Sequence, residues 1–346
     1  MIGRPTGVLL LQLGTPASPS TSDVRRYLRE FLSDRRVLDM SAPARALLLN
    51  AVILPFRPRR SAEAYRKIWT DQGSPLTIHT EALSAAVQDL LGERYRVEFG
   101  MRYQSPSIES AVDSLTASGC DRIVILPLFP QYASASGGSA VEKAMEVIGA
   151  RWNLPEVTAL GAFYDEPGYL TAVAEVAKPL LDDFAPDHVL FSYHGLPEKQ
   201  IRKSDASSSW CLASSSCCDQ MLDANRFCYR AQCYATTRGL VAALGIGDGA
   251  FSTAFQSRLA GQKWIEPYTD KVLPALYEGG VRRLAVLTPS FTADCLETIE
   301  EIGIRGRSQW GSLGHGDFLL VPCVNASPAW AATVAGMVRR AAQFPR

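Results

Sequence analysis

Five of the eight cysteines are concentrated in residues 211–233, where their thiolates could hold a metal centre. The run has the spacing C-x5-C-C-x9-C-x4-C and lacks the CxxC pairs of a zinc ribbon. The N-terminal residues do not form a secretion signal, so we expect thiolate ligation rather than disulfides. An iron–sulfur cluster on four thiolates fits this irregular spacing best; a zinc site and unliganded cysteines are the alternatives. The five are Cys211, Cys217, Cys218, Cys228 and Cys233, and the adjacent Cys217 and Cys218 suggest that one of this pair is the spare.

A histidine and three acidic residues form a second candidate for chemistry. His194 ends an apolar strand pattern, and an ordinary imidazole can accept a proton or bind a metal near neutral pH. Asp294, Glu297 and Glu301 are spaced i, i+3, i+7, which predicts carboxylates on one face of a helix that starts around Asp294. Such a ladder could pass protons or a hydrated cation to a buried group. The simpler interpretation is a hydrogen-bonded turn histidine and acidic residues that cap a helix.

Several residues of the first half could bind acidic groups on a flat ligand. The segment SASGGSA at 134–140, which includes Ser136 and Ser139, opens a helix after a strand, and its N–H groups could bind a carboxylate or phosphate. It is neither a Walker loop nor a dinucleotide-binding motif, so nucleotide use is disfavoured. Lys67 and the pair Arg102 and Tyr103 add cations and a phenol, with solvated surface as the ordinary alternative.

The elements that must position these residues alternate between short apolar runs and helical patterns. This alternation is typical of a parallel sheet covered by helices on both faces. Helical patterns fill 107–117, 138–149 and 169–184 among others. We expect strands at 7–13, 96–100, 122–128, 158–163, 188–193, 251–255, 283–288 and 318–322.

Two stretches of the first half are echoed in the second. VLLLQLGTP at 8–16 parallels VLFSYHGLP at 189–197, and CDRIVILPLFPQY from Cys120 parallels VRRLAVLTPSF from Val281. We therefore expect an α/β fold of two similar doubly wound, Rossmann-like lobes with parallel sheets. The lobes would span 1–160 and 161–346, the second would contain the cysteine-rich segment 205–233, and terminal helices could be exchanged between them. Because ligands bind beyond the carboxyl ends of parallel strands, we expect an interlobe cleft lined by Leu13, Arg102, Gln131, Tyr132 and His194.

Composition excludes several other classes of protein. With 346 residues, 47% of them hydrophobic, the chain is long enough for a large packed core. The balance of 35 basic and 35 acidic side chains argues against a nucleic-acid binder and favours a small-molecule partner. The apolar run 46–56 covers about half of the roughly 20 residues that a spanning helix needs. Followed by Arg57, Arg59 and Arg60, this run could lie on a membrane surface or form a buried helix.

Together these motifs resemble the ferrochelatase family, whose members insert ferrous iron into a porphyrin late in haem synthesis. The resemblance rests on LLLQLGTP, GSPL (73–76), FGMRY (99–103), LPLFPQY (126–132), SYHGLP (192–197), FQSRLAGQKWIEPYTD (255–270) and PSFTADCLETIEEI (289–302), in this order. It implies that His194 is a metal ligand or proton acceptor, that Glu297 is its carboxylate partner, and that Glu301 and Asp294 continue the polar path. It also implies porphyrin contacts by Leu13 and Trp264, with Arg102, Lys67 and residues 136–139 near the propionates.

The resemblance also implies a cofactor and partners. The cysteine segment looks like the internal [2Fe-2S] segment of some bacterial ferrochelatases, with a structural or sensing role. The substrates would be Fe(II) and protoporphyrin IX; coproporphyrin as substrate, or a porphyrin-binding iron or redox sensor without catalysis, are the alternatives. We expect a cytoplasmic monomer or weak dimer that could contact the inner membrane face peripherally and that does not bind nucleic acid.

Overall fold

The strands of the described residues form two four-stranded parallel sheets, one in each of two units of the chain. The computed structural model describes residues 4–258 and 261–343. The first unit contains Met1–Phe129, Ala133–Ala162 and Asn325–Arg346, and the second contains Pro130–Tyr132 and Phe163–Val324.

The first sheet has the strand order β2-β1-β3-β4. Its central strand β1 (Thr6–Gly14) pairs in parallel with β2 (Tyr95–Tyr103) and β3 (Arg122–Pro127), and β3 pairs with β4 (Glu156–Ala159). The side chains of residues 8–11 are completely buried. An unbroken apolar run is what a strand covered on both faces requires, which is why β1 does not alternate between apolar and polar residues.

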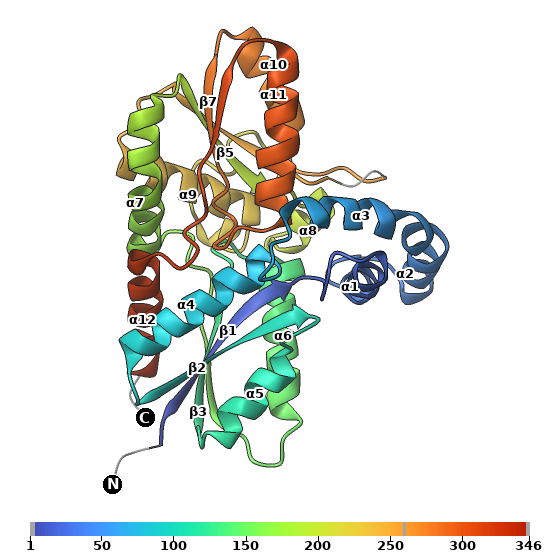
Figure 1. Ribbon diagram of the computed structural model, residues 1–346, viewed down its shortest axis with the longest axis vertical. Coiled ribbons are helices and arrows are strands. Elements are labelled where there is room, and N and C mark those ends of the chain that lie inside the picture. The colour runs from blue at the N-terminus through green and yellow to red at the C-terminus, as the bar shows by residue number, and fades with distance from the viewer. Residues whose placement is uncertain (1–3, 259–260, 344–346) are drawn as a thin grey trace. The chain divides into compact units, whose positions relative to one another are not determined.

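Helices cover both faces of this sheet. Helices α5 (Ile108–Ala117) and α6 (Ser139–Gly149) pack on one face, and α4 (Pro75–Leu91) and α12 (Pro328–Ala342) on the other (Figure 1). The α5 and α6 face is filled by residues such as Leu9, Val112 and Ile125. The π-helix η2 (Ser134–Gly138) leads directly into α6.

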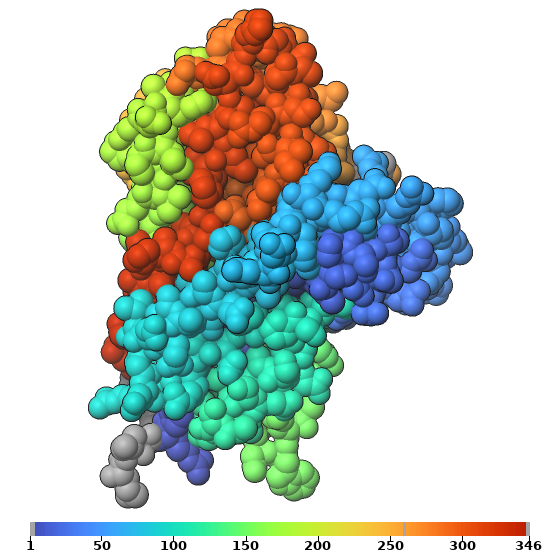
Figure 2. Space-filling model, in the orientation of Figure 1, coloured from blue at the N-terminus to red at the C-terminus, as the bar shows by residue number. Residues whose placement is uncertain are grey.

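Residues 21–68 form the remaining helices of the first unit. They comprise α1 (Thr21–Ser33), α2 (Ala42–Leu47), the π-helix η1 (Leu48–Ile53) and α3 (Leu54–Ile68). Helices α1 and α3 pack together, and this stretch forms one continuous blue surface in Figure 2. The interpretation of 46–56 as a plain buried helix is wrong: Leu49 and Leu54 are buried, but Leu47, Val52 and Phe56 are 69%, 53% and 77% exposed. None of the described helices is long and apolar enough to cross a membrane.

The second sheet repeats the order of the first, as β6-β5-β7-β8. Its parallel strands are β5 (His188–His194), β6 (Phe251–Gln256), β7 (Arg283–Leu287) and β8 (Asp317–Leu320). This repetition confirms the expected fold class of two similar α/β halves with parallel sheets. Each of the eight predicted strands overlaps an observed one, and the largest shift is at β4, which begins and ends earlier than expected.

The helices of the second unit include two elements important for the site. The first is α9 (Tyr229–Leu244), which packs against α7 (Pro167–Phe184), and the second is the π-helix η4 (Leu296–Gly306). Ile302 of η4, Trp310 and Phe318 pack together with strand residues in one hydrophobic core. The other helices are α8 (Glu198–Lys203), the 3-10 turn η3 (Asp223–Asn225), α10 (Thr269–Glu278) and α11 (Arg307–Leu313).

Candidate active site

His194 is the last residue of β5, and its backbone is held on both sides. Its N–H donates to Ser290 Oγ at 3.1 Å, and its carbonyl accepts from the Tyr229 hydroxyl at 2.8 Å. The ring atom Nδ1 lies 2.6 Å from the Gly195 carbonyl oxygen. Because a carbonyl only accepts, Nδ1 is the donor in this contact. In the neutral ring, Nε2 then carries the lone pair that can accept a proton or bind a metal.

The turn after His194 depends on a close backbone approach at Gly195. A Cβ at this position would lie 2.7 Å from the Gln256 carbonyl oxygen and 3.3 Å from the Trp264 ring, so a larger residue does not fit. Because the two backbones lie so close, the Gly195 N–H donates to the Gln256 carbonyl at 2.7 Å. Trp264 is 6% exposed, and the structure therefore packs it against this turn.

The three acidic residues do not share one α-helical face as predicted. Asp294 precedes the helix, and Glu297 and Glu301 lie on the π-helix η4, which begins at Leu296. Thr298 explains the start of the helix: its hydroxyl accepts from the Cys295 N–H and lies 3.0 Å from an Asp294 carboxylate oxygen. The carboxylate of the buried Asp294 also accepts from the Cys323 N–H, so Asp294 holds the start of η4.

Glu297 is tied to the strand beside His194. Its backbone carbonyl accepts from Gln256 Nε2 at 2.8 Å, and Gln256 is the register partner of His194 on β6. Its carboxylate accepts from the Cys295 thiol at 3.1 Å. Sequence reasoning missed both residues, because Gln256 is far from Glu297 in the sequence and Cys295 lies outside the cysteine-rich segment.

Glu301 completes a group of three interacting ionisable side chains. Burial raises the pKa of its carboxyl above the usual range, and the Glu297 carboxylate adds to this effect. Hydrogen bonds from the Ser257 N–H and hydroxyl, and the charges of His194 and Arg305, act in the opposite direction. The structure thus brings His194, Glu297 and Glu301 into one electrostatic group within the second unit.

The cysteine segment brings four of its five thiols into contact. Cys217 and Cys218 lie 3.7 Å apart at their sulfurs, and Cys228 is in hydrogen-bonding contact with both Cys211 and Cys218. The fifth thiol, Cys233, is fully buried within α9, where it contacts Tyr229. Both members of the adjacent pair belong to this group of four contacting thiols, whereas the hydrogen-bonding contact of Cys233 is with Tyr229.

Polar side chains fix the backbone around these thiols. The Asp205 carboxylate accepts from the Trp210 and Cys211 N–H groups, each at 2.7 Å. Hydrogen bonds from Ser207 and from these backbone groups lower the Asp205 pKa. Asn225, which is 1% exposed, donates to the Cys217 carbonyl at 3.0 Å and accepts from the Leu222 N–H.

All eight cysteines are free in the structure. Within residues 4–258 and 261–343, no group of three or more His, Cys, Asp or Glu side chains is arranged to hold a single metal ion. The four thiols contact one another in the order Cys211, Cys228, Cys218 and Cys217. The 3.7 Å between the sulfurs of Cys217 and Cys218 is close to the spacing of two thiolates on one tetrahedral metal with bonds of about 2.3 Å. Four is the number of thiolate ligands that a [2Fe-2S] cluster uses, and a structural zinc ion can use four as well.

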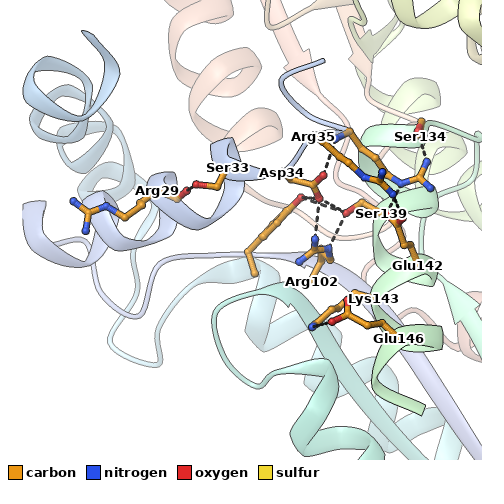
Figure 3. Close-up of polar contacts among 12 residues, drawn as sticks. Arg29, Ser33, Asp34, Arg35, Arg102, Ser134, Ser139, Glu142, Lys143 and Glu146 are labelled. Carbon is orange, nitrogen blue, oxygen red and sulfur yellow. Dashed lines mark hydrogen bonds and ion pairs between the residues drawn. The ribbon is translucent and has the colours of Figure 1, made fainter. Parts of the chain in front are cut away.

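In the first unit, Arg102 and Ser139 meet at Asp34 (Figure 3), and Tyr103 contacts the same carboxylate. Arg102 Nη2 and the Tyr103 hydroxyl donate to one Asp34 oxygen at 2.9 and 2.8 Å, and the Ser139 hydroxyl contacts the same oxygen. Arg102 Nε also donates to Ser139 at 2.7 Å. Burial alone would raise the Asp34 pKa, but these hydrogen bonds, one from the Arg36 N–H and the Arg102 charge together lower it. Sequence reasoning missed Asp34, a single acid after a helix with no periodic pattern around it.

Beside this cluster, two further arginines contact the start of α6 (Figure 3). Arg35 and Arg36 both pair with Glu142, and Arg36 also donates to Ser134 at 2.7 Å. Of the other predicted contacts in the first unit, Leu13 is half-buried near the end of β1, Lys67 is exposed in the last turn of α3, and Ser136 is half-buried in η2.

Gln131 and Tyr132 belong to the second unit, where they contact α9. The Gln131 amide donates to Thr236 Oγ1 at 2.9 Å and to the Pro289 carbonyl at 3.1 Å, and Gln131 is 2% exposed. The Tyr132 N–H donates to Gln232 Oε1 at 2.6 Å. These bonds anchor the short segment 130–132 on α9.

The chain is similar to known proteins along almost its whole length. A family model described as Ferrochelatase matches residues 5–342. A ferrochelatase of Coxiella burnetii (strain CbuK_Q154) is 44% identical over 338 residues, which cover 98% of this chain and 94% of that protein. One of Legionella pneumophila (strain Lens) is 45% identical over 332 residues, which cover 96% and 98%. Among solved structures, SirB from Bacillus subtilis with Fe3+ has a similar fold, with a TM-score of 0.53 at 12% identity over 98% of this chain and 96% of that one. The chain belongs to the ferrochelatase family and is a metal chelatase.

Proposed function

We propose that this chain inserts Fe(II) into protoporphyrin IX to form haem, with release of two protons. The observation that carries the proposal is the group of His194, Glu297 and Glu301 in one unit, with the His194 Nε2 lone pair free of its own proton. Metallation must remove two pyrrole protons, so the site needs acceptors more than it needs a nucleophile.

His194 and the two glutamates can take up these protons in sequence. Nε2 would accept a pyrrole proton, and the imidazolium formed would be stabilised by the nearby carboxylates. A raised pKa makes Glu301 a better proton acceptor than an exposed glutamate. A proton taken by His194 could therefore pass toward Glu301 and leave the porphyrin nitrogens free to bind iron.

The same residues suit the iron substrate. Fe(II) accepts imidazole nitrogen and carboxylate oxygen as ligands. Before Nε2 of His194 accepts a proton, it and the carboxylate of Glu297 are the groups that we assign to the incoming iron as it loses its water. Asp294, whose carboxylate is engaged by Thr298 and Cys323, would support η4 rather than carry protons.

Arg102 and Lys67 are our candidates for the porphyrin carboxylates. Asp34 and Ser139 hold the Arg102 guanidinium in place, which lowers the entropy cost of binding a propionate. The proposed porphyrin-binding set also contains Leu13, Tyr103, Gln131, Tyr132, Ser136 and Trp264. Of the whole set, Tyr103, Ser139, Gln131 and Trp264 are buried and would support the residues that contact the porphyrin.

We assign a [2Fe-2S] cluster to Cys211, Cys217, Cys218 and Cys228. The pairwise thiol contacts and the burial of all four support this assignment. When bound, such a cluster would supply covalent cross-links within the segment through iron–thiolate bonds. Arg230, whose Nη1 lies 3.2 Å from Cys218 Sγ, would offset the negative charge of the thiolates.

A peripheral membrane contact of a cytoplasmic monomer or weak dimer is proposed for the α2, η1 and α3 stretch. Exposed Leu47, Val52 and Phe56 are followed by Arg57, Arg59 and Arg60. An apolar patch beside a basic cluster is suited to an anionic lipid surface. Delivery of an apolar porphyrin would be easier from such a surface.

The experiment is an anaerobic titration of the purified protein with protoporphyrin IX and ferrous iron, followed by visible absorption. Conversion of the free-porphyrin spectrum into a haem spectrum is the expected result. His194→Ala should abolish it, whereas His315→Ala, an exposed histidine of the same unit, should not. Undiminished turnover in His194→Ala would contradict the role of this histidine. Faster turnover of coproporphyrin than of protoporphyrin IX would make coproporphyrin the assigned substrate. Porphyrin binding without metal insertion would contradict the enzymatic function and favour a porphyrin-binding sensor.

A further inference from the structure

The cysteine segment ends where a helix that supports His194 begins. Cys228 is the N-cap of α9, and its carbonyl accepts the Gln232 N–H at 3.0 Å. Its own N–H donates to the Asn225 carbonyl at 2.8 Å, and the Asn225 side chain donates to the Cys217 carbonyl. The position of the first turn of α9 is therefore set by the segment that carries the four contacting thiols.

The next residue, Tyr229, connects this turn to His194. Tyr229 is 6% exposed, and its hydroxyl donates to the His194 carbonyl at 2.8 Å. The phenol oxygen is also within hydrogen-bonding contact of Ser290, the residue that accepts the His194 N–H. Both backbone polar groups of His194 are thus held by two side chains that contact each other. Cys228 is thus connected to His194, the proposed proton acceptor, through Tyr229 and its hydrogen bond to the His194 carbonyl.

From this connection we propose that Tyr229 is a positioning residue that makes the orientation of His194 depend on the state of the cysteine segment. The inference rests on the cluster assigned above. Ligation of Cys228 fixes the N-cap of α9 and hence the phenol, and the phenol fixes the peptide groups on either side of the His194 Cα. Loss of the cluster releases Cys228, the first turn of α9 loosens, and His194 loses one of its two backbone anchors.

The proposal gives the cluster a role that involves no electron transfer. A metal centre at the N-cap of α9 would hold the first turn of the helix in place. Its effect would reach His194 through the hydrogen bond from the Tyr229 hydroxyl to the His194 carbonyl. Since Gly195 keeps its bond to the Gln256 carbonyl, the turn does not unfold without the Tyr229 contact. The result of losing the contact is a less well oriented imidazole, which lowers kcat rather than porphyrin affinity.

The test compares Tyr229→Phe with Tyr193→Phe. Tyr193 is also buried and donates or accepts one hydrogen bond, with Thr237 at 2.9 Å, and its side chain alternates with that of His194 along β5. Iron and sulfide content is measured first for each protein. Then kcat, KM for protoporphyrin IX, and hydrogen exchange of the peptide that covers 190–198 are measured before and after removal of the cluster by a chelator.

In the wild type and in Tyr193→Phe, cluster removal should lower kcat by roughly tenfold and speed exchange of this peptide, with KM changed less than about twofold. Tyr229→Phe should retain its iron and sulfide, show the low kcat and fast exchange from the start, and lose its response to the chelator. Equal responses of Tyr229→Phe and the wild type to cluster removal would overturn the inference. A wild-type protein purified anaerobically without iron or sulfide would instead overturn the cluster assignment itself.

Discussion

The Arg102 guanidinium meets the Asp34 carboxylate at 2.9 Å, with 18% and 4% of the two side chains exposed. Tyr103 and Ser139 contact the same carboxylate oxygen, so one acidic group organises a cation, a phenol and a hydroxyl. The arrangement makes Asp34 the residue on which the geometry of Arg102 depends, although it stands far from Arg102 in the sequence.

We expect Asp34→Asn to lower the free energy of unfolding by about 2 kcal/mol at pH 7, because a buried charged hydrogen-bond network loses its acceptor charge. The Asp34 pKa is lowered in the folded protein, so its ionised form contributes stability above the unfolded pKa of about 3.9. This contribution is lost as the pH falls through the folded pKa, and the difference between variant and wild type should shrink below about pH 4. Denaturant unfolding at several pH values measures it. Asp113→Asn, which breaks an exposed pair with Arg151, is the control and should cost less than about 1 kcal/mol.

Glu301→Gln should separate stability from activity. The Glu301 pKa is raised by burial, so the folded state favours the protonated form and the ionised form costs stability once the pH exceeds the folded pKa. The neutral amide avoids this cost, and the variant should be more stable than the wild type at pH 8 but not below about pH 4. Its iron insertion rate should fall by about 10² because a proton acceptor is lost. Thermal unfolding and single-turnover haem formation measure the two effects. Glu278→Gln, at an exposed position in the same unit, should change neither, and a stable Glu301→Gln variant with the full rate would remove Glu301 from the proton path.

Cysteine substitutions should reveal which thiols bind iron. Cys218→Ser should abolish the visible absorption between about 400 and 600 nm that thiolate-to-iron charge transfer produces, and should remove the iron and sulfide with it. Cys233→Ala should retain all three, since its thiol contacts Tyr229 outside the group of four. Iron and sulfide analysis of anaerobically purified protein is the measurement. Loss of the cluster in Cys233→Ala together with its retention in Cys217→Ser would restore the ligand set suggested by the adjacent cysteines.

Phe56→Ser should weaken binding to anionic vesicles by about tenfold or more, because burying a phenylalanine side chain contributes about 1.5–3 kcal/mol. Sedimentation with vesicles rich in phosphatidylglycerol measures this, and vesicles of phosphatidylcholine alone test the contribution of the arginines. Trp152 provides a matched control, since it is 98% exposed on a loop of the same unit. Binding that depends on Trp152 and not on Phe56 would move the contact away from α3.

The sheets could be predicted from the sequence because a strand buried on both faces has an unmistakable pattern. Residues 8–11 and 123–126 are continuous apolar runs with no exposed side chain. The exposed side chains of the 46–56 run were harder to foresee, since π-helical turns change which residues share a face.

Contacts between distant residues were the part that the sequence could not supply. Asp294 satisfies a helical spacing with Glu297, yet it lies before η4 because Thr298 and the Cys323 N–H engage its carboxylate. Tyr229 and Asn225 occupy ordinary positions in a polar segment, and their roles depend on which backbone groups the fold brings to them. Propensity and periodicity carry no information about such partners.

The membership of α12 in the first unit has a consequence for synthesis. Its buried face, which includes Trp330, Val334 and Val338, packs with α4 and β3, elements made from the first 130 residues. A chain that emerges from the ribosome N-terminus first exposes the matching face of the first sheet until residues 328–342 appear. The second unit, which consists of 130–132 and 163–324, is complete before that moment. During synthesis the first unit therefore begins to form before the second unit but is completed after it, whereas domains usually fold in order from the N-terminus.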